Sequence, residues 1–208
     1  MSRNITYICN FDVSFKPNFQ ENIVKKCGLK ESVELVNESY KIKSNRTVVV
    51  VGSGPAGLFA ARTLSEANVK VVLLERGEPV LDRVETVNKL LKEGKLNKES
   101  NIQFGEGGAG TFSDGKLNTG ISSPLVNDVL KTFHECGAEE NVLYDAKPHI
   151  GTDHLRNVVV NLRNKIIKNG GNVLFNSKFI DFNIIDNKVY VKFIKNNNEE
   201  TIVANDLV

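Results

Sequence analysis

Two short apolar runs near the middle of this chain enclose a segment with helical spacing. Val48–Val51 is a run of four valines, and Val71–Leu74 is a second continuous apolar run. Such runs are typical of strands in a parallel sheet, which are buried on both faces. Gly52, Gly54 and Gly57 follow the first run and lead into apolar residues at helical spacing. The pattern predicts a strand, a glycine turn, a helix and a second parallel strand.

The remainder of the chain continues with helices and then changes to strands. Helices are predicted at 81–93, from Ser123-Pro124 to Cys136 with Gly137 after it, and from a capping Thr152 to Gly170-Gly171. A third parallel strand is predicted at 173–175, and a meander at 178–185, 188–195 and 200–204 with turns at Asp186-Asn187 and Asn196–Asn198. The predicted fold class is therefore α/β, a three-layer Rossmann-like fold with a parallel sheet and a β-meander.

The composition limits the classes of partner. Of the 27 basic and 25 acidic side chains, residues 1–45 hold 7 and 5, which leaves 20 of each in the remainder. This balance argues against binding to nucleic acid or to an anionic membrane. The sequence contains neither a spanning apolar stretch nor a secretory leader, so we expect a cytoplasmic protein. We interpret 1–45 as a small lead-in segment, with a helix at 22–36 and a strand near 38–42, and 46–208 as the main domain.

The cysteines and histidines suggest neither redox pairs nor a metal site. Cys9, Cys27 and Cys136 are isolated and form no C-x-x-C motif. The three histidines lie on three different predicted elements. We therefore expect reduced thiols without chemistry and no bound metal.

The first glycine turn has the spacing of a dinucleotide-binding motif. Gly52 suits the tight turn, Gly54 lets a pyrophosphate approach the backbone, and Gly57 lets the helix pack on the strand. Pro55 is compatible with a first helical turn. Glu75 ends the second strand, near the position of the acid that binds ribose hydroxyls, and it makes NADP a poor candidate for this site. The alternative is a turn used only for packing.

A second glycine-rich stretch, 100–117, has five glycines within eleven residues and predicts an irregular loop. Its backbone N–H groups could wrap a flat or phosphorylated ligand, with Thr111, Ser113, Asp114 and Lys116 as polar groups. The alternative is a flexible lid or a connection that contacts no ligand.

Two further side chains are candidates for a site. Arg83 could reach a diphosphate from the following helix, or could lie on the solvated surface. His149 lies beside a predicted helix N-terminus, which favours its neutral form. Neutral imidazole can polarise a carbonyl or relay a proton, although a structural turn is the simpler interpretation.

Four segments together, 51–61, 74–77, 100–117 and 147–153, resemble the bacterial FAD-dependent dehydrogenase-like family, a branch of the glutathione-reductase-type flavoproteins. The resemblance covers about 46–208. It implies a Rossmann-like FAD-binding fold, with FAD as cofactor and the loop at 105–116 along the flavin and ribityl chain, but no defined substrate. The expected cofactor-binding residues are Gly52, Gly54, Pro55, Ala56, Gly57, Glu75, Arg76, Arg83, Gly107, Gly108, Gly110 and Thr111.

The chain departs from this family in its length. Family members continue with a further strand, a distal Gly-Asp motif and a substrate domain, whereas this chain stops near Asp206. The expectation is a truncated N-terminal fragment that retains flavin weakly and tends to aggregate. Its partner would be the missing C-terminal half or another chain.

Three functions follow as hypotheses. The first is an FAD-dependent oxidoreductase with an unknown small-molecule substrate, NAD(P)H as a candidate electron donor, and His149 and Lys116 as weak candidates for catalytic contacts near the flavin. The second is a non-catalytic dinucleotide- or ADP-binding module. The third is an NAD-dependent dehydrogenase that uses the first motif alone, although the loop at 100–117 would then have no role.

Overall fold

A parallel sheet forms the centre of the part of the chain that the structure describes. The computed structural model describes residues 45–113, 115–145 and 147–208, which belong to one unit of the chain, residues 39–208. The sheet has the order β3-β2-β1-β7, and its neighbouring strands are all parallel. Its strands are β1 (Thr47–Val51), β2 (Lys70–Leu74), β3 (Asn172–Leu174) and β7 (Asp206–Leu207).

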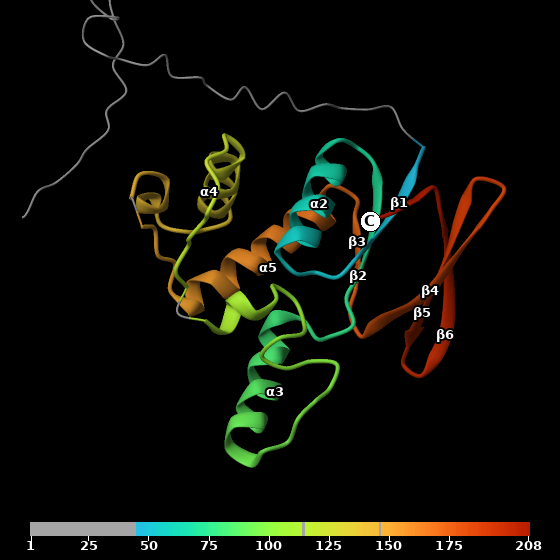
Figure 1. The fold of residues 1–208 in the computed structure, drawn as a ribbon, viewed down its shortest axis with the longest axis horizontal. Coiled ribbons are helices and arrows are strands. Elements are labelled where there is room, and N and C mark those ends of the chain that lie inside the picture. Colours follow the sequence, from blue (N-terminus) through green and yellow to red (C-terminus); the bar gives the residue numbers. More distant parts are fainter. Residues whose placement is uncertain (1–44, 114, 146) are drawn as a thin grey trace, which may run out of the picture. The chain divides into compact units, whose positions relative to one another are not determined.

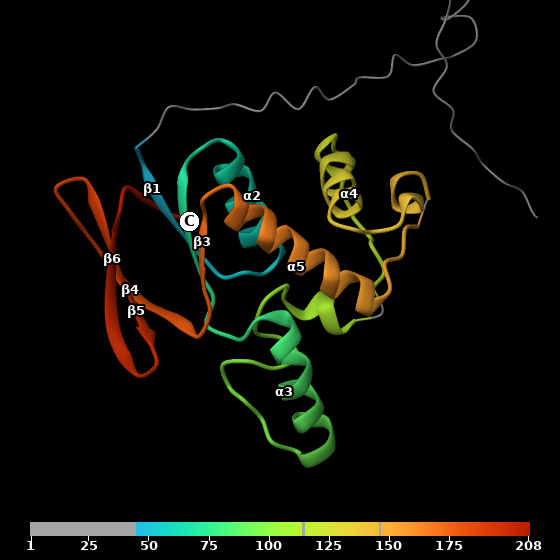
Figure 2. The same cartoon turned by 180° about the vertical axis from the view of Figure 1, so that it is seen from behind.

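Helices α2 (Pro55–Glu66) and α5 (Thr152–Lys168) cover one face of this sheet (Figures 1 and 2). The other described helices are α3 (Val80–Glu93) and α4 (Leu125–Glu135), with short 3₁₀ turns η1 (Ala109–Phe112) and η2 (Glu140–Leu143). Alternate residues of β1 and β2 point toward the helices. Val48, Val50 and Leu73 share one core with Leu58 of α2 and Leu162 of α5. Burial of these apolar side chains fixes the two helices on the sheet.

The opposite face of the sheet packs against an antiparallel meander. Its strands are β4 (Ser177–Ile185), β5 (Lys188–Lys195) and β6 (Asn198–Ala204). Val49 and Leu74 share a second core with Val191 and Phe193. The result is the three-layer α/β fold that the sequence predicts, with helices, parallel sheet and meander as its layers (Figure 1).

Two-residue turns join the strands of the meander. Asp186 and Asn187 have φ of 49° and 57°, and Asn196 and Asn197 have φ of 50° and 64°. Positive φ at both central residues is typical of the tight hairpin turns that match strand twist, and asparagine and aspartate tolerate it. The sequence therefore located both hairpins, although the second predicted turn, Asn196–Asn198, is one residue too long because Asn198 begins β6.

The predicted strands and helices are confirmed wherever the structure describes them, with small corrections. The cap of α5 is Gly151, without a side-chain cap hydrogen bond, so the prediction that Thr152 is the cap is wrong. The predicted lead-in elements at 22–36 and 38–42 lie outside the described residues. Within those that are described, no helix is long and apolar enough to span a membrane.

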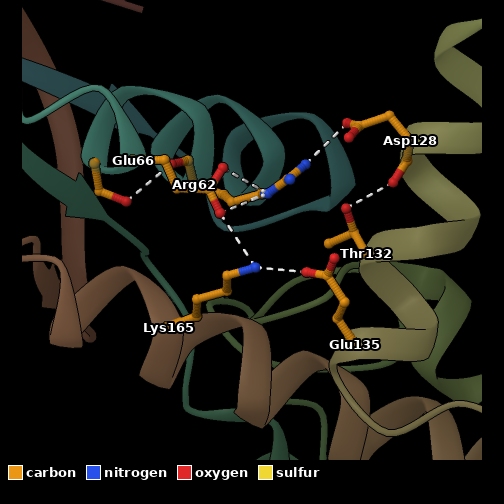
Figure 3. Close-up of polar contacts among 7 residues, drawn as sticks. Arg62, Glu66, Asp128, Thr132, Glu135 and Lys165 are labelled. Carbon is orange, nitrogen blue, oxygen red and sulfur yellow. Dashed lines mark hydrogen bonds and ion pairs between the residues drawn. The ribbon is translucent and has the colours of Figure 1, made fainter. Parts of the chain in front are cut away.

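Ion pairs tie α4 to the two central helices, as Figure 3 shows. Arg62 of α2 donates to Asp128 of α4 at 2.9 Å and to Glu66 within its own helix at 3.1 Å. Lys165 of α5 pairs with Glu135 of α4 at 2.7 Å and with Glu66 at 3.2 Å. Three helices therefore share one cluster of alternating charges.

Candidate functional site

The first glycine turn is shaped for close approach of a ligand. Gly52 has φ of 92°, and its N–H donates to the Leu74 carbonyl at 2.7 Å. A Cβ on Gly57 would overlap the Gly52 carbonyl oxygen, so this position requires glycine for packing. A Cβ on Gly54 would meet nothing within 4 Å. Gly54 therefore leaves open space at the N-terminus of α2, where helix N–H groups have no intrahelical partner.

Glu75 is buried and its carboxylate is held by the turn itself. Oε2 accepts from the Ser53 N–H at 2.8 Å and from Ser53 Oγ at 2.7 Å, while Oε1 accepts from the Gly77 N–H at 2.8 Å. An ionised carboxylate has about four acceptor positions. One position therefore remains for a ligand such as a ribose hydroxyl. The role of Ser53 in holding Glu75 was missed in the sequence, where it stands only as the variable residue between two glycines.

The second glycine-rich loop packs directly on the first turn. The Gly107 N–H donates to the Ser53 carbonyl at 2.8 Å. A Cβ on Gly108 would lie 3.3 Å from Pro55 Cδ and 3.8 Å from Gly54 Cα. The two motifs that the sequence presents separately therefore form one site.

Arg83 lies inside this loop and is fully buried. Its guanidinium donates to the carbonyls of Asn101 at 2.9 Å, Ile102 at 2.9 Å and Glu106 at 2.6 Å. It also donates to Thr111 Oγ1 at 2.9 Å. Burial lowers the pKa of Arg83 to about 10, which leaves it cationic at neutral pH.

The burial of Arg83 shows that its solvated-surface interpretation is wrong. Its contacts give it a role in shaping the loop, and its expected contact with a diphosphate stays a prediction. The Thr111 side chain is likewise used within the loop, because its hydroxyl accepts from Arg83 and donates to the Gly108 carbonyl at 2.9 Å. The guanidinium groups of Arg83 and Arg156 both lie over the Phe112 ring, 4.7 and 4.8 Å from its centroid. Arg83 of α3 and Arg156 of α5 therefore hold the loop in place.

Glu106 is a second buried charged residue of the loop, and sequence reasoning missed it. Its Oε2 accepts from the Val80 N–H at 2.8 Å and from Arg163 Nη1 at 2.8 Å. Its Oε1 is buried and has no hydrogen-bond partner among the described residues. Burial raises the pKa of Glu106, and the negative charge of Glu75 adds to the rise. Glu106 therefore connects the loop to α3 and α5 while it resists ionisation.

Replacement of Glu106 by glutamine is expected to remove a contribution to stability that decreases with rising pH. Because its pKa is higher in the folded state than the ordinary 4.5, the folded state binds more protons above pH 4.5. The contribution of Glu106 to the free energy of unfolding therefore decreases as pH rises through the folded pKa. Urea titrations between pH 4 and 8 would measure this slope in wild type and in Glu106→Gln.

Glu99→Gln is the control for this experiment. Hydrogen bonds from Lys178 and Arg76 lower the pKa of Glu99, so its contribution appears with rising pH and is lost on acidification. The two variants should therefore change the slope in opposite directions. Parallel profiles for wild type and Glu106→Gln would contradict the burial argument.

A cavity of about 360 Å³ adjoins Gly54 and Glu75. It is lined by Val51, Gly52, Gly54, Leu74, Glu75, Arg76, Gln103, Phe104, Gly105, Gly108, Lys178 and Phe179. We call it the nucleotide cavity, after the ligand that the sequence predicts for its glycine turn. It brings together Gly52, Gly54, Glu75, Arg76 and Gly108 from the predicted set, whereas Gly107, Gly110 and Pro55 line a different cavity.

Arg76 and Lys178 line the nucleotide cavity, and both bind the carboxylate of Glu99. Arg76 Nε donates to Glu99 at 2.6 Å, and its guanidinium lies 4.8 Å from the Phe104 ring centroid. Lys178 Nζ donates to the other oxygen of Glu99 at 2.9 Å. These groups supply positive charge and an aromatic face near Glu75, which suits an anionic ligand with a planar ring.

The two candidate catalytic residues lie side by side, and neither lines the nucleotide cavity. Lys116 and His149 form an antiparallel backbone bridge. Lys116 lines the cavity shared by Gly107 and Gly110, while His149 lines another one with His154. Their proposed contact with a flavin stays a prediction.

Among the described residues, no cluster of three His, Cys, Asp or Glu could hold a metal ion. Cys136 is buried, and burial raises the pKa of its thiol, which disfavours the reactive thiolate.

The sequence of the described domain matches a known protein family. Residues 46–208 match the family described as pyridine nucleotide-disulphide oxidoreductase. The chain belongs to this family. The match places an FAD/NAD(P)-binding oxidoreductase domain on the residues that form the two glycine motifs and the meander.

A relative of this pyridine nucleotide-disulphide oxidoreductase chain is an uncharacterized protein of Clostridium beijerinckii. It is 48% identical over 159 residues, which are 76% of this chain and 29% of the relative. The chain thus spans less than a third of that protein.

Two solved structures are similar to part of this chain at low sequence identity. The 3-ketosteroid-Δ4-(5α)-dehydrogenase of Rhodococcus jostii RHA1 has a TM-score of 0.46 at 15% identity and matches 78% of this chain and 45% of its own. The aklavinone-11 hydroxylase, solved with FAD and aklavinone, has a TM-score of 0.40 at 18% identity and matches 80% and 32%.

Proposed function

We propose that this domain binds FAD and serves an FAD-dependent oxidoreductase of the dehydrogenase type. The observation that carries the proposal is the open space at Gly54. It lies at the N-terminus of α2 and shares one cavity with Glu75 and Gly108. A diphosphate can approach the free N–H groups at the start of a helix where a glycine leaves open space. A carboxylate with one remaining acceptor position can accept a hydrogen bond from a ribose hydroxyl.

The residues present fit the ADP half of the cofactor. Gly54, Ala56 and Gly57 precede the first intrahelical bond, from the Leu58 N–H to the Gly54 carbonyl, so their N–H groups are the ones that would hold phosphate oxygens. Glu75 would accept from one ribose hydroxyl. Bound FAD would supply the electron-transfer chemistry, while this chain binds and orients it. NAD(P)H is the candidate electron donor, and the substrate is a small molecule of unknown identity.

Purified protein is expected to bind FAD and ADP, and Gly54→Val is expected to weaken both by roughly 100-fold. The valine side chain would occupy the space through which the diphosphate approaches. Its fold should persist, because Gly54 has φ of −68° and ψ of −179°, a conformation open to any residue. Flavin fluorescence measures FAD binding, and calorimetry measures ADP binding.

Gly120→Val is the matched control, since a Cβ there also meets nothing within 4 Å and Gly120 does not line the nucleotide cavity. It should bind both ligands as wild type does. Equal affinity of wild type and Gly54→Val for FAD would overturn the proposal.

A non-catalytic nucleotide-binding module is the second candidate. Among the described residues that line the nucleotide cavity there is no histidine or cysteine to act on a ligand, and this favours a module that only binds. Catalysis would then need a further segment or a partner chain. Binding of ADP as tightly as FAD would favour this module, whereas tighter binding of FAD would favour a flavin contact beyond the ADP half. NAD that binds in place of FAD would support an NAD-dependent dehydrogenase.

A further inference from the structure

A second cavity, of about 150 Å³, lies between α2, α5, α4 and the glycine-rich loop. We call it the apolar cavity. Its lining includes Leu58 of α2, Val158 and Leu162 of α5, Phe133 of α4, and Ser113 and Lys116 of the loop. Leu58, Val158 and Leu162 are buried, whereas Ser113 and Lys116 are exposed. The cavity thus has an apolar floor and a polar rim, as small-molecule sites do.

Helix α4 holds one wall of this cavity in place. Phe133 of α4 packs edge-to-face on Phe59 of α2, with ring centroids 5.8 Å apart. The ion pairs from Arg62 to Asp128 and from Lys165 to Glu135 fasten α4 beside this contact (Figure 3). The wall is therefore anchored by charges as well as by the aromatic pair.

The glycine-rich loop separates the two cavities by a single layer of backbone. Gly107 lines the apolar cavity, and Gly108, the next residue, lines the nucleotide cavity. At the start of α2, Pro55 lines the apolar cavity, and the adjacent Gly54 lines the nucleotide cavity. Whatever occupies the apolar cavity therefore lies next to the start of α2.

We propose that the apolar cavity binds a compact apolar ring, of about benzene size, carried by the organic substrate. Cavities of this volume with apolar linings stay dry and take up small aromatic molecules. A ring buried on Leu58, Val158 and Leu162 leaves its substituents toward the rim at Ser113 and Lys116. Binding of the ring is independent of the proposed function, and only its place in a substrate rests on FAD being held in the neighbouring cavity.

Toluene is the probe for this cavity. In the full chain without added flavin, toluene should shift the methyl NMR signals of Val158 and Leu162, with a Kd on the order of 1 mM. Val158→Leu adds a methylene that takes up part of the cavity, so it should weaken toluene binding at least about tenfold. Val87→Leu makes the same change at a buried valine of α3 outside the cavity and should leave the affinity unchanged.

If Val158→Leu folds poorly, Val158→Ala provides the second test. The enlarged cavity should then admit naphthalene, which wild type should bind far more weakly. Absence of methyl shifts in wild type would overturn the inference, as would equal toluene affinity in Val158→Leu and wild type. A protein that binds toluene but not FAD would support the apolar cavity as a binding site and contradict the proposed function. A protein that binds FAD but not toluene would support the proposed function and contradict the inference about the apolar cavity.

Discussion

Arg83→Leu is expected to lower the free energy of unfolding by about 4 kcal/mol and to abolish nucleotide binding. The change removes a fully buried cation and leaves the carbonyls of Asn101, Ile102 and Glu106 without their donor. Each orphaned polar group in a buried site costs about 1–3 kcal/mol. The loop that carries Gly108 would lose the group around which it is folded, so the nucleotide cavity would lose one wall. Urea unfolding followed by circular dichroism measures the first effect, and FAD titration the second.

Two further variants sharpen this test. Arg83→Lys retains the charge but lacks the planar fork, so it should restore part of the stability and little of the binding. Arg46→Leu removes an exposed arginine whose partner is Asp206 and should cost no more than about 1 kcal/mol. A stability of Arg83→Leu within 1 kcal/mol of wild type would show that the loop does not depend on this arginine.

Gly57→Ala is expected to be the other severe substitution, with a loss of about 3 kcal/mol or more. Alanine is the better helix former by about 1 kcal/mol, so local propensity alone predicts the opposite sign. Its Cβ, however, would overlap the Gly52 carbonyl oxygen, and neither atom can move without displacing α2 from β1. Thermal and urea unfolding of Gly57→Ala would measure the cost.

The contrast with Gly54→Ala separates the two uses of glycine in one motif. A Cβ at Gly54 meets no protein atom within 4 Å, so this variant should keep the wild-type stability and still bind ADP more weakly. Gly57→Ala should lose stability first and binding as a consequence. Equal stability of the two variants would refute the packing role of Gly57.

Local pattern was sufficient for most of the architecture. The valine run of β1 and the apolar run of β2 predicted buried parallel strands, because such strands need continuous apolar sequence. Paired residues that tolerate positive φ marked both hairpins of the meander. These signals are local, since the conformations of neighbouring residues decide them, and they located the two glycine motifs and Glu75 as well.

The environment of individual side chains could not be predicted in this way. Position in a helix suggests that Arg83 faces either ligand or solvent, yet a loop from later in the chain folds over it and uses four of its hydrogen bonds. Glu106 stands among glycines in the sequence and gives no sign of its burial. Lys116 and His149 look like parts of one site, although they line separate cavities.

The sequence by itself therefore determined the order of strands and helices, the glycine turn and the acid at the end of β2. Only the tertiary structure decided that the two glycine segments share one wall, that Arg83 supports it from within, and that an apolar cavity lies behind it. The reason is physical. Backbone conformation follows from neighbouring residues, whereas burial, charge partners and cavities arise between segments that are distant along the chain and meet only when the sheet and its helices are packed.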